Sequence, residues 1–292
     1  MNPDEILFRA SSTGSIMTDG DGMITEKQLK TIEEYEAKPK LTDIQGAELR
    51  RLKDKRDNPE LSLTTKKQLL KVYAKAEFDR EEEVISKYMD KGTIAEDDSI
   101  TLYSLVKKRF FKKNELRINN RYLSGLPDLF DGPDDDIQNA EEIVDIKSSW
   151  SLDTFLAAKF ANGVNKDYYW QGQSYLALVP KAKRFRLVYV LINTPAELIT
   201  DEKKKLLYQN RYDETDPEYI EACKNIEKNH IFDMALFRSH FPYFEFHNEL
   251  WVWDIPKEKR YHEIVIECDP IAINALYERI TMCRGWMKEK LL

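Results

Sequence analysis

The most constraining feature of this sequence is a short apolar run, Glu142 to Ser148, that carries two charged residues near its end. An extended strand places residues two apart on the same face, so Asp145 and Lys147 should point the same way while Ile146 points into the core. The run therefore predicts a buried strand that presents a carboxylate and an ammonium group side by side. That pairing is suited to chemistry on a phosphate.

The elements around this strand predict an α/β fold in which a central mixed β-sheet is flanked by helices. Two strands of a hairpin or meander are expected over 110–123 and 125–131, followed by a loop and the strand 142–148. Later strands are expected over 185–192 and 263–268. Apolar periodicity predicts helices over 81–108, 151–161, 166–179, 270–291 and several within 196–240.

The chain of 292 residues is expected to form one domain. Its core spans about 82–193, a helical insertion spans about 25–80, and C-terminal helices, a strand and a helix occupy 196–291. Capping boxes predict insertion helices that begin at Thr25 and Thr65, and Thr42 can cap a third. Such a charged arm either grips a partner or covers a sheet, and we favour the cover.

Composition excludes several classes of protein. No run of about 18 apolar residues is present, and the N-terminus lacks the basic leader and apolar core of a signal peptide, so a soluble intracellular protein without a membrane partner is expected. The three scattered cysteines argue against a disulfide framework, a zinc site and a four-cysteine iron–sulfur cluster. They are expected to be reduced thiols: Cys223, Cys268 and Cys283.

The net charge of −7 counts mildly against a dedicated nucleic-acid-binding domain, but the distribution of charge matters more than its sum. Basic residues gather in two clusters near the 142–148 run. The first comprises Lys107, Lys108, Arg109, Lys112 and Lys113, and the second Lys181, Lys183, Arg184 and Arg186. Contact with a polyanion and ordinary solvated charge both remain open for each cluster.

Two further patterns gain meaning from their position. Pro-Asp occurs three times, but only Pro127-Asp128 has a strand-like setting ahead of the 142–148 run, where the proline keeps Leu126 extended. In the helix expected after that run, Gln171 and Tyr175 are four residues apart and share one face. The intervening acidic residues, 134–136 and 141–142, are interpreted as a solvated loop.

In this order and spacing, the motifs resemble those of the PD-(D/E)XK nuclease superfamily, most closely its phage-type exonuclease branch of YqaJ-like and lambda-exonuclease-like recombination nucleases. The resemblance implies a restriction-endonuclease-like core. The positions that carry it are Gly92 with Glu96, Gly125 with Pro127 and Asp128, Asp145 to Trp150, and Gln171 with Tyr175. Near the N-terminus, Arg9, Ser11 and Ser12 are similar to residues that hold a terminal phosphate.

The resemblance also implies roles for these residues. Oxygen ligands for Mg²⁺, with Mn²⁺ as a substitute, would come from Glu96, Asp128, Asp145 and the backbone carbonyl of Ile146. Lys147 would orient or help deprotonate the attacking water and offset transition-state charge, and Gln171 and Tyr175 would donate hydrogen bonds. DNA contacts are expected from Arg9, Ser11, Ser12, Ser148 and Trp150.

The function implied is a Mg²⁺-dependent deoxyribonuclease, a 5′ to 3′ exonuclease acting on double-stranded DNA ends in phage-type recombination. Such enzymes imply a single-strand annealing protein as partner, a ring-shaped homo-oligomer, and the cytoplasm of a bacterial host that carries the phage or prophage. Two alternatives stay open: an endonuclease of the restriction or resolvase type, and a nuclease-fold DNA-binding or scaffold protein that has lost activity. The Gln171 and Tyr175 pair argues against the first, and the complete acidic set with Lys147 argues against the second.

Overall fold

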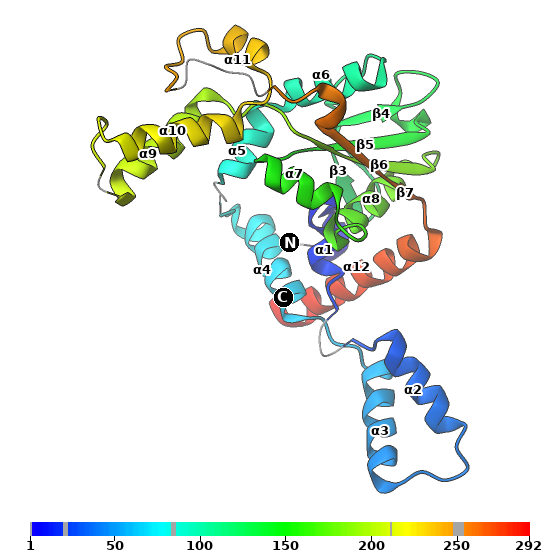
Figure 1. Cartoon of the computed structure of the whole chain (residues 1–292). Coiled ribbons are helices and arrows are strands. Elements are labelled where there is room, and N and C mark those ends of the chain that lie inside the picture. The colour runs from blue at the N-terminus through cyan, green and yellow to red at the C-terminus, as the bar shows by residue number, and fades with distance from the viewer. Residues whose placement is uncertain (1, 20–22, 83–85, 211, 248–253) are drawn as a thin grey trace.

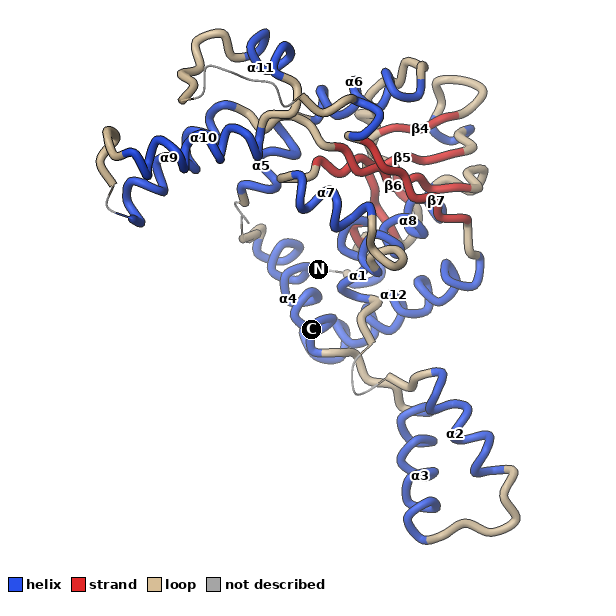
Figure 2. Tube along the Cα trace, viewed as in Figure 1, coloured by secondary structure: helices blue, strands red, loops and turns tan. Residues whose placement is uncertain are grey.

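A computed structural model describes residues 2–19, 23–82, 86–210, 212–247 and 254–292 of the chain. The described residues form a mixed α/β structure with two small sheets at its centre and helices around them (Figure 1; Figure 2). The expected fold class is therefore confirmed. None of the helices in this described part combines the length and the apolar composition that a membrane span needs.

The larger sheet has four strands in the order β4-β5-β6-β7. Its two central strands, β5 and β6, are parallel, and the outer strands pair antiparallel to them. The expected strand 142–148 is confirmed as β5. The bounds are β4 (Leu129–Asp131), β5 (Glu142–Ser148), β6 (Arg184–Val190) and β7 (Tyr261–Glu267).

The smaller sheet corrects the hairpin expected over 110–131. It contains β1 (Phe8–Arg9), β2 (Ile118–Asn119) and β3 (Leu123–Gly125) in the order β1-β3-β2, so β3 and β4 belong to different sheets. The break falls at Pro127, which has no N–H for a ladder. Residues 110–117 form no strand, because the main-chain N–H and side chain of Asn114 are bound to the Pro127–Asp128 turn.

Twelve α-helices occupy most of the remaining described chain. The first six are α1 (Thr13–Ile16), α2 (Glu26–Glu36), α3 (Asp43–Asp57), α4 (Leu63–Phe78), α5 (Lys87–Ile94) and α6 (Glu96–Lys107). The others are α7 (Leu152–Lys159), α8 (Lys166–Leu178), α9 (Ala196–Asn210), α10 (Pro217–His230), α11 (Met234–His240) and α12 (Pro270–Leu291).

The expected helix starts are confirmed at two of three positions. Thr25 and Thr42 each form a capping box at the start of α2 and α3. The box expected at Thr65 is wrong, because the hydroxyl of Ser62 accepts the Thr65 N–H and α4 begins three residues earlier. The helical segment expected over 81–108 is divided at Ala95 into α5 and α6, and residues 83–85 within it lie outside the described residues.

The insertion does not cover a sheet as we had favoured. Figure 1 shows the α2–α3 hairpin extending away from the sheets, and only α4 of the insertion packs on the body, against α1 and α12. Two buried residues, Ile32 and Leu52, are available to hold the hairpin together. Most of the remaining surface of α2 and α3 is polar, but Leu29 and Ile44 are also exposed.

Two apolar cores lie on the two faces of the larger sheet. On one face, α8 and α12 cover Ile143, Phe185 and Leu187. On the other face, α6 covers Val144 and Val188. Alternate residues of β5 therefore face α8 or α6, which fixes the direction in which each of its side chains points.

The chain ends are joined through α12. Arg284 donates to the carbonyl oxygens of Ile6 at 2.6 Å and Arg121 at 2.8 Å, and Arg279 donates to the carbonyl oxygen of Ile16 at 3.0 Å. Both arginines are buried, so these bonds to main-chain oxygens are made away from water, where they stabilise the docking of the N-terminal segment.

Helix α8 approaches β6 closely at Gly172. A β-carbon at this position would lie 2.4 Å from Cδ1 of Phe185, whose ring is fully buried and cannot move aside without disturbing the core. By contrast, a β-carbon on Gly285 of α12 would meet no atom within 4 Å. The two helical glycines therefore differ in the space beside them, Gly172 being buried and Gly285 exposed.

We expect Gly172→Ala to lower the free energy of unfolding by about 1–3 kcal/mol, because the added methyl group forces α8 away from β6. The control Gly285→Ala should raise it by about 0.4–1 kcal/mol through reduced freedom of the unfolded chain. Denaturant unfolding followed by circular dichroism measures both. Equal effects of the two substitutions would show that α8 does not pack on β6 as described.

Candidate active site

Strand β5 presents Asp145 and Lys147 on the face that α8 covers, as the two-residue alternation requires. The carboxylate of Asp145 is 3% exposed, and its Oδ2 lies 2.5 Å from Nζ of Lys147, which is 28% exposed. The expected pair is therefore formed, and the lysine is its more accessible member. Ile146 points to the opposite face, where it packs against the α6 core.

Helix α8 connects the two acidic residues of the site through one hydrogen-bonded chain. The side-chain amide of Gln171 donates to Oδ1 of Asp145 at 3.0 Å and to Oη of Tyr175 at 3.3 Å. Tyr175 in turn donates to the carbonyl oxygen of Leu126 at 3.2 Å, two residues before Asp128. Gln171 and Tyr175 thus hold Asp145 and the Pro127–Asp128 turn at a fixed separation.

Asp128 lies where the pairing of β4 with β5 ends. Leu129 pairs with Val144, so the next step in the antiparallel register brings Asp128 opposite Asp145. Oδ2 of Asp128 accepts the main-chain N–H of Ile146 at 2.6 Å. Asn114 fixes the turn from the other side, since its main-chain N–H donates to the Asp128 carbonyl oxygen at 2.7 Å.

The electrostatics of the site reflect burial of several charges together. Burial, and then the charge of Asp145, raises the pKa of Asp128 to about 7, against the lowering effect of the Ile146 N–H. Burial alone would lower the pKa of Lys147, but the charge and hydrogen bond of Asp145 outweigh it and the net shift is upward. Burial raises the pKa of Tyr175, which remains a neutral donor.

The donor set fits a divalent cation in part. Asp128 and Asp145 lie side by side and largely buried, and the Lys147 ammonium beside Oδ2 of Asp145 compensates only one of the two charges. The pair of carboxylates therefore suits a hard cation. Glu96 instead forms an ion pair with Lys113 at 2.8 Å. Among the described residues, no three His, Cys, Asp or Glu side chains converge closely enough to hold a metal ion.

The residues expected to hold a terminal phosphate lie in the smaller sheet. Arg9 ends β1 and is paired with Ser124 in the register of β3, the strand that leads into the Pro127–Asp128 turn. Its guanidinium contacts Glu81 at 3.0 Å. Ser11 is exposed, and Ser12 donates to the carbonyl oxygen of Arg9 at 2.9 Å. Phosphate binding by this group stays a prediction.

Ser148 and Trp150 make their contacts within the protein. The Ser148 hydroxyl lies 2.8 Å from that of Ser99 on α6, on the sheet face opposite Asp145. The Trp150 ring packs edge-on against His230 at a centroid distance of 4.9 Å. Their DNA contacts stay predictions, and neither residue lies on the Asp145 face of β5.

Sequence reasoning missed two residues that support the site. The Tyr168 ring on α8 lies 5.1 Å from Nζ of Lys147, and its spacing of three residues before Gln171 was a signal that could have found it. Lys91 of α5 is fully buried and donates to the carbonyl oxygens of Ser149 at 2.7 Å and Trp150 at 3.0 Å. Burial lowers the pKa of Lys91 to about 7.

The acidic loop is only partly as expected. Residues 134–136 are exposed, which confirms the solvated interpretation. For Glu142 that interpretation is wrong, because its buried carboxylate forms ion pairs with Arg184 and Arg186 of β6 on the face opposite Asp145. The two arginines of the second basic cluster are therefore engaged in ion pairs with the protein's own carboxylates.

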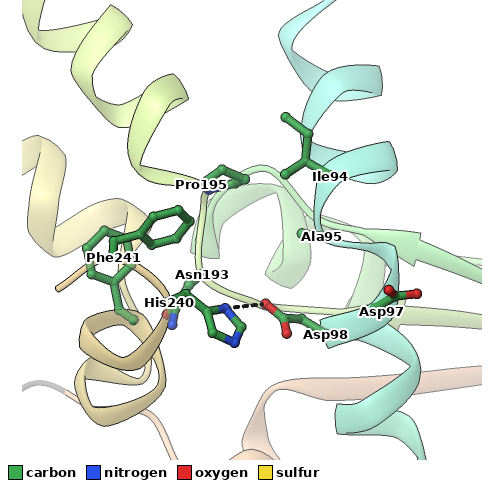
Figure 3. Close-up of a pocket in the computed structure, with 9 residues that line it drawn as sticks. Ile94, Ala95, Asp97, Asp98, Asn193, Pro195, His240 and Phe241 are labelled. Atoms are coloured by element: carbon green, nitrogen blue, oxygen red, sulfur yellow. Dashed lines mark ion pairs between the residues drawn. The ribbon is translucent and has the colours of Figure 1, made fainter. Parts of the chain in front are cut away.

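A separate pocket of about 330 Å³ lies beside the first turn of α6. Figure 3 shows Asp98 of α6 directed at His240 of α11, with which it forms an ion pair at 3.4 Å. Burial raises the pKa of Asp98, against the opposing charge of His240. The residues of the site described above, Asp128, Asp145 and Lys147, do not line this pocket.

Comparisons with known proteins agree with this architecture. Searches against protein-family models and against curated proteins found no match. Among solved structures, the chain is similar to a phage-related exonuclease from Haemophilus somnus 129PT, with 17% identity, a TM-score of 0.60, and coverage of 98% of this chain and 96% of that one.

A second similar structure is the alkaline exonuclease LHK-Exo from Laribacter hongkongensis, with 11% identity, a TM-score of 0.51, and coverage of 97% of this chain and 89% of that one. The same exonuclease in complex with dAMP matches with 10% identity, a TM-score of 0.50, and coverage of 99% of this chain and 90% of that one. Over nearly its whole length, the chain has the fold of these phage-related and alkaline exonucleases.

Proposed function

We propose that this protein is a metal-dependent deoxyribonuclease that hydrolyses DNA phosphodiester bonds, and specifically a 5′ to 3′ exonuclease on double-stranded ends. The observation that carries the proposal is the series of hydrogen bonds that leads from Asp145 through Gln171 and Tyr175 to the Asp128 turn, with Lys147 beside Asp145. The fold shared with exonucleases supports the same conclusion.

Each residue in this series of hydrogen bonds has a role that follows from its contacts. Lys147, kept as an ammonium by the raised pKa, would bind the scissile phosphate and orient the attacking water rather than remove its proton. Gln171 and Tyr175 are positioning residues, because they contact Asp145 and the Asp128 turn. Burial of the whole group strengthens these interactions by excluding water.

The cation would be held by Asp128, Asp145 and the carbonyl oxygen of Ile146, and by Glu96 if its carboxylate leaves Lys113. Mg²⁺ is the ion of choice, with Mn²⁺ as a substitute, since all these donors are oxygens. When bound, the ion would supply Lewis-acid polarisation of the phosphate and a lowered pKa for a water. Its positive charge would also neutralise the two buried carboxylates.

The ion pair of Glu96 with Lys113 favours one rival function, a nuclease-fold DNA-binding or scaffold protein without activity. In that case Glu96 would serve only to hold Lys113. An endonuclease is the other rival, with the same chemistry but no need for a DNA end. The experiments below separate the three.

The biological setting is proposed on the resemblance of the motifs. We propose double-stranded DNA ends as substrate, a single-strand annealing protein as partner, a ring-shaped homo-oligomer, and the cytoplasm of a bacterial host carrying the phage or prophage. That a similar exonuclease is known in complex with dAMP supports a nucleotide as the ligand class.

Replacing Asp145 or Lys147 with alanine should lower the rate of DNA cleavage at least about 100-fold, because Asp145 would hold the cation and Lys147 would bind the phosphate. Lys204→Ala on α9, which removes an exposed lysine, is the matched control and should cleave as the wild type does. Steady-state cleavage of a linear duplex measures this. Near-normal rates for either site variant would exclude the site.

Gln171→Ala should lower cleavage about 10- to 100-fold, as expected when a partner that orients an acidic ligand is lost. Tyr175→Phe should cost less, under about tenfold, because Tyr175 reaches Asp145 only through Gln171. The exposed Gln138 provides the control, as Gln138→Ala. A larger loss for Tyr175→Phe than for Gln171→Ala would contradict the proposal that Tyr175 acts on Asp145 through Gln171.

Incubation with Mg²⁺ should degrade a linear duplex labelled at one 5′ end, releasing the label early, and should leave a circular duplex intact. A chelator should stop the reaction and Mn²⁺ should restore it. Gel electrophoresis of both substrates side by side is the measurement. Cleavage of the circle would favour the endonuclease, and no metal-dependent product from either substrate would favour the scaffold.

A further inference from the structure

A nearly fully exposed phenylalanine stands in the first basic cluster, just past the end of α6. The Phe110 side chain is 85% exposed, whereas its neighbour Phe111 is 8% exposed and packs against Tyr103 at a centroid distance of 4.8 Å. An exposed aromatic ring gains nothing from the core of the protein. Phe110 is therefore a candidate for contact with another molecule.

The main chain is held in place on both sides of Phe110. Lys108 adopts the left-handed conformation that ends α6, with a φ of 53°, and the next main-chain N–H, of Arg109, donates to the carbonyl oxygen of Ser104 at 3.1 Å. On the far side, the main-chain N–H of Phe111 donates to the Ser104 hydroxyl at 3.2 Å. The exposed position of Phe110 is thus built into the turn.

Some of the basic side chains around Phe110 form ion pairs within the protein, and others do not. Lys107, Arg109 and Lys113 form ion pairs with Glu263, Asp131 and Glu96 respectively. Within the described part of the chain, Lys108 and Lys112 have no carboxylate partner. Together with Phe110 and Leu105 they line an open cleft of about 740 Å³, whose one acidic residue is Asp97.

This cleft is adjacent to the candidate active site. Phe110 precedes Lys113 by three residues, so the Cα atoms of the two lie at most about 11 Å apart. The ammonium group of Lys113 contacts Glu96. Asn114 then binds the Asp128 turn directly. The Cα atoms of Phe110 and Asn114, four residues apart, lie at most about 14 Å from each other, which corresponds to a few nucleotides at about 3.4 Å each.

We propose that Phe110, Lys108 and Lys112 form a platform for the substrate strand, in which Phe110 stacks on a base within a few nucleotides of the scissile phosphate and the lysines contact phosphates. The inference rests on the proposed function. An apolar patch alone would suit a protein partner equally well. An aromatic ring flanked in sequence by two lysines that have no carboxylate partner among the described residues matches the alternation of base and phosphate in a nucleic acid strand.

Equilibrium binding of a fluorescently labelled oligonucleotide tests the ring. With Ca²⁺ in place of Mg²⁺ to prevent cleavage, Phe110→Ala should weaken binding about 5- to 150-fold, the range for removal of one base–aromatic stack. Phe110→Trp should keep wild-type affinity. Tyr208→Ala on α9 is the matched control, because that side chain is 84% exposed and should not affect binding.

The salt dependence of binding tests the lysines. The double variant Lys108→Gln with Lys112→Gln should reduce the slope of log affinity against log salt by about 1.4 to 1.8, because two phosphates of the strand are no longer neutralised by the protein. Lys204→Gln should leave the slope unchanged. An unchanged slope in the double variant would remove the lysines from the platform.

Different results would overturn the nuclease function and the Phe110 platform. A wild-type protein that neither binds nor cleaves DNA would overturn the proposed function and the platform together. A wild-type protein that does both, with Phe110→Ala equal to it in affinity, would overturn the platform alone.

Discussion

The arrangement of the whole site depends on burying one carboxylate. Asp145 is almost completely removed from water in the centre of a sheet, which is costly unless its charge is compensated. Lys147 supplies the opposite charge at one carboxylate oxygen, and Gln171 donates a hydrogen bond to the other. Asp128 beside it is a second buried carboxylate, whose pKa is raised by burial and by the charge of Asp145. Two buried carboxylates with one lysine between them are a poor way to stabilise a fold, and they are what a site that binds a cation requires.

Helix α8 meets that requirement because its buried polar side chains are directed at specific partners. Gln171 holds Asp145, while Gln173 donates to the carbonyl oxygen of Glu267 at 2.9 Å and Ser174 donates to the Thr13 hydroxyl at 2.9 Å. The same helix therefore joins the site to the end of β7 and to α1. Segments from both ends of the chain thus take part in positioning one glutamine.

Local patterns predicted the parts of this structure whose geometry is set within a few residues. The alternation in β5 gave the direction of Asp145, the spacing in α8 gave the Gln171 partnership, and the capping boxes gave the starts of α2 and α3. The prediction went wrong where distant residues decide. Glu142 belongs to an acidic stretch that is typical of a loop. Its carboxylate is instead buried by ion pairs with Arg184 and Arg186 of β6, more than 40 positions away.

The ion pair of Glu96 with Lys113 shows how an acidic protein could accept DNA. The net charge of −7 disfavours a polyanion less where acidic groups are already paired, and near the site Glu96 is paired with a lysine. A cation that drew Glu96 toward Asp128 and Asp145 would release Lys113 to a phosphate. Metal and DNA would then each lower the cost of binding the other. The cation would take the Glu96 carboxylate away from Lys113, and a DNA phosphate would replace that carboxylate as the partner of the lysine.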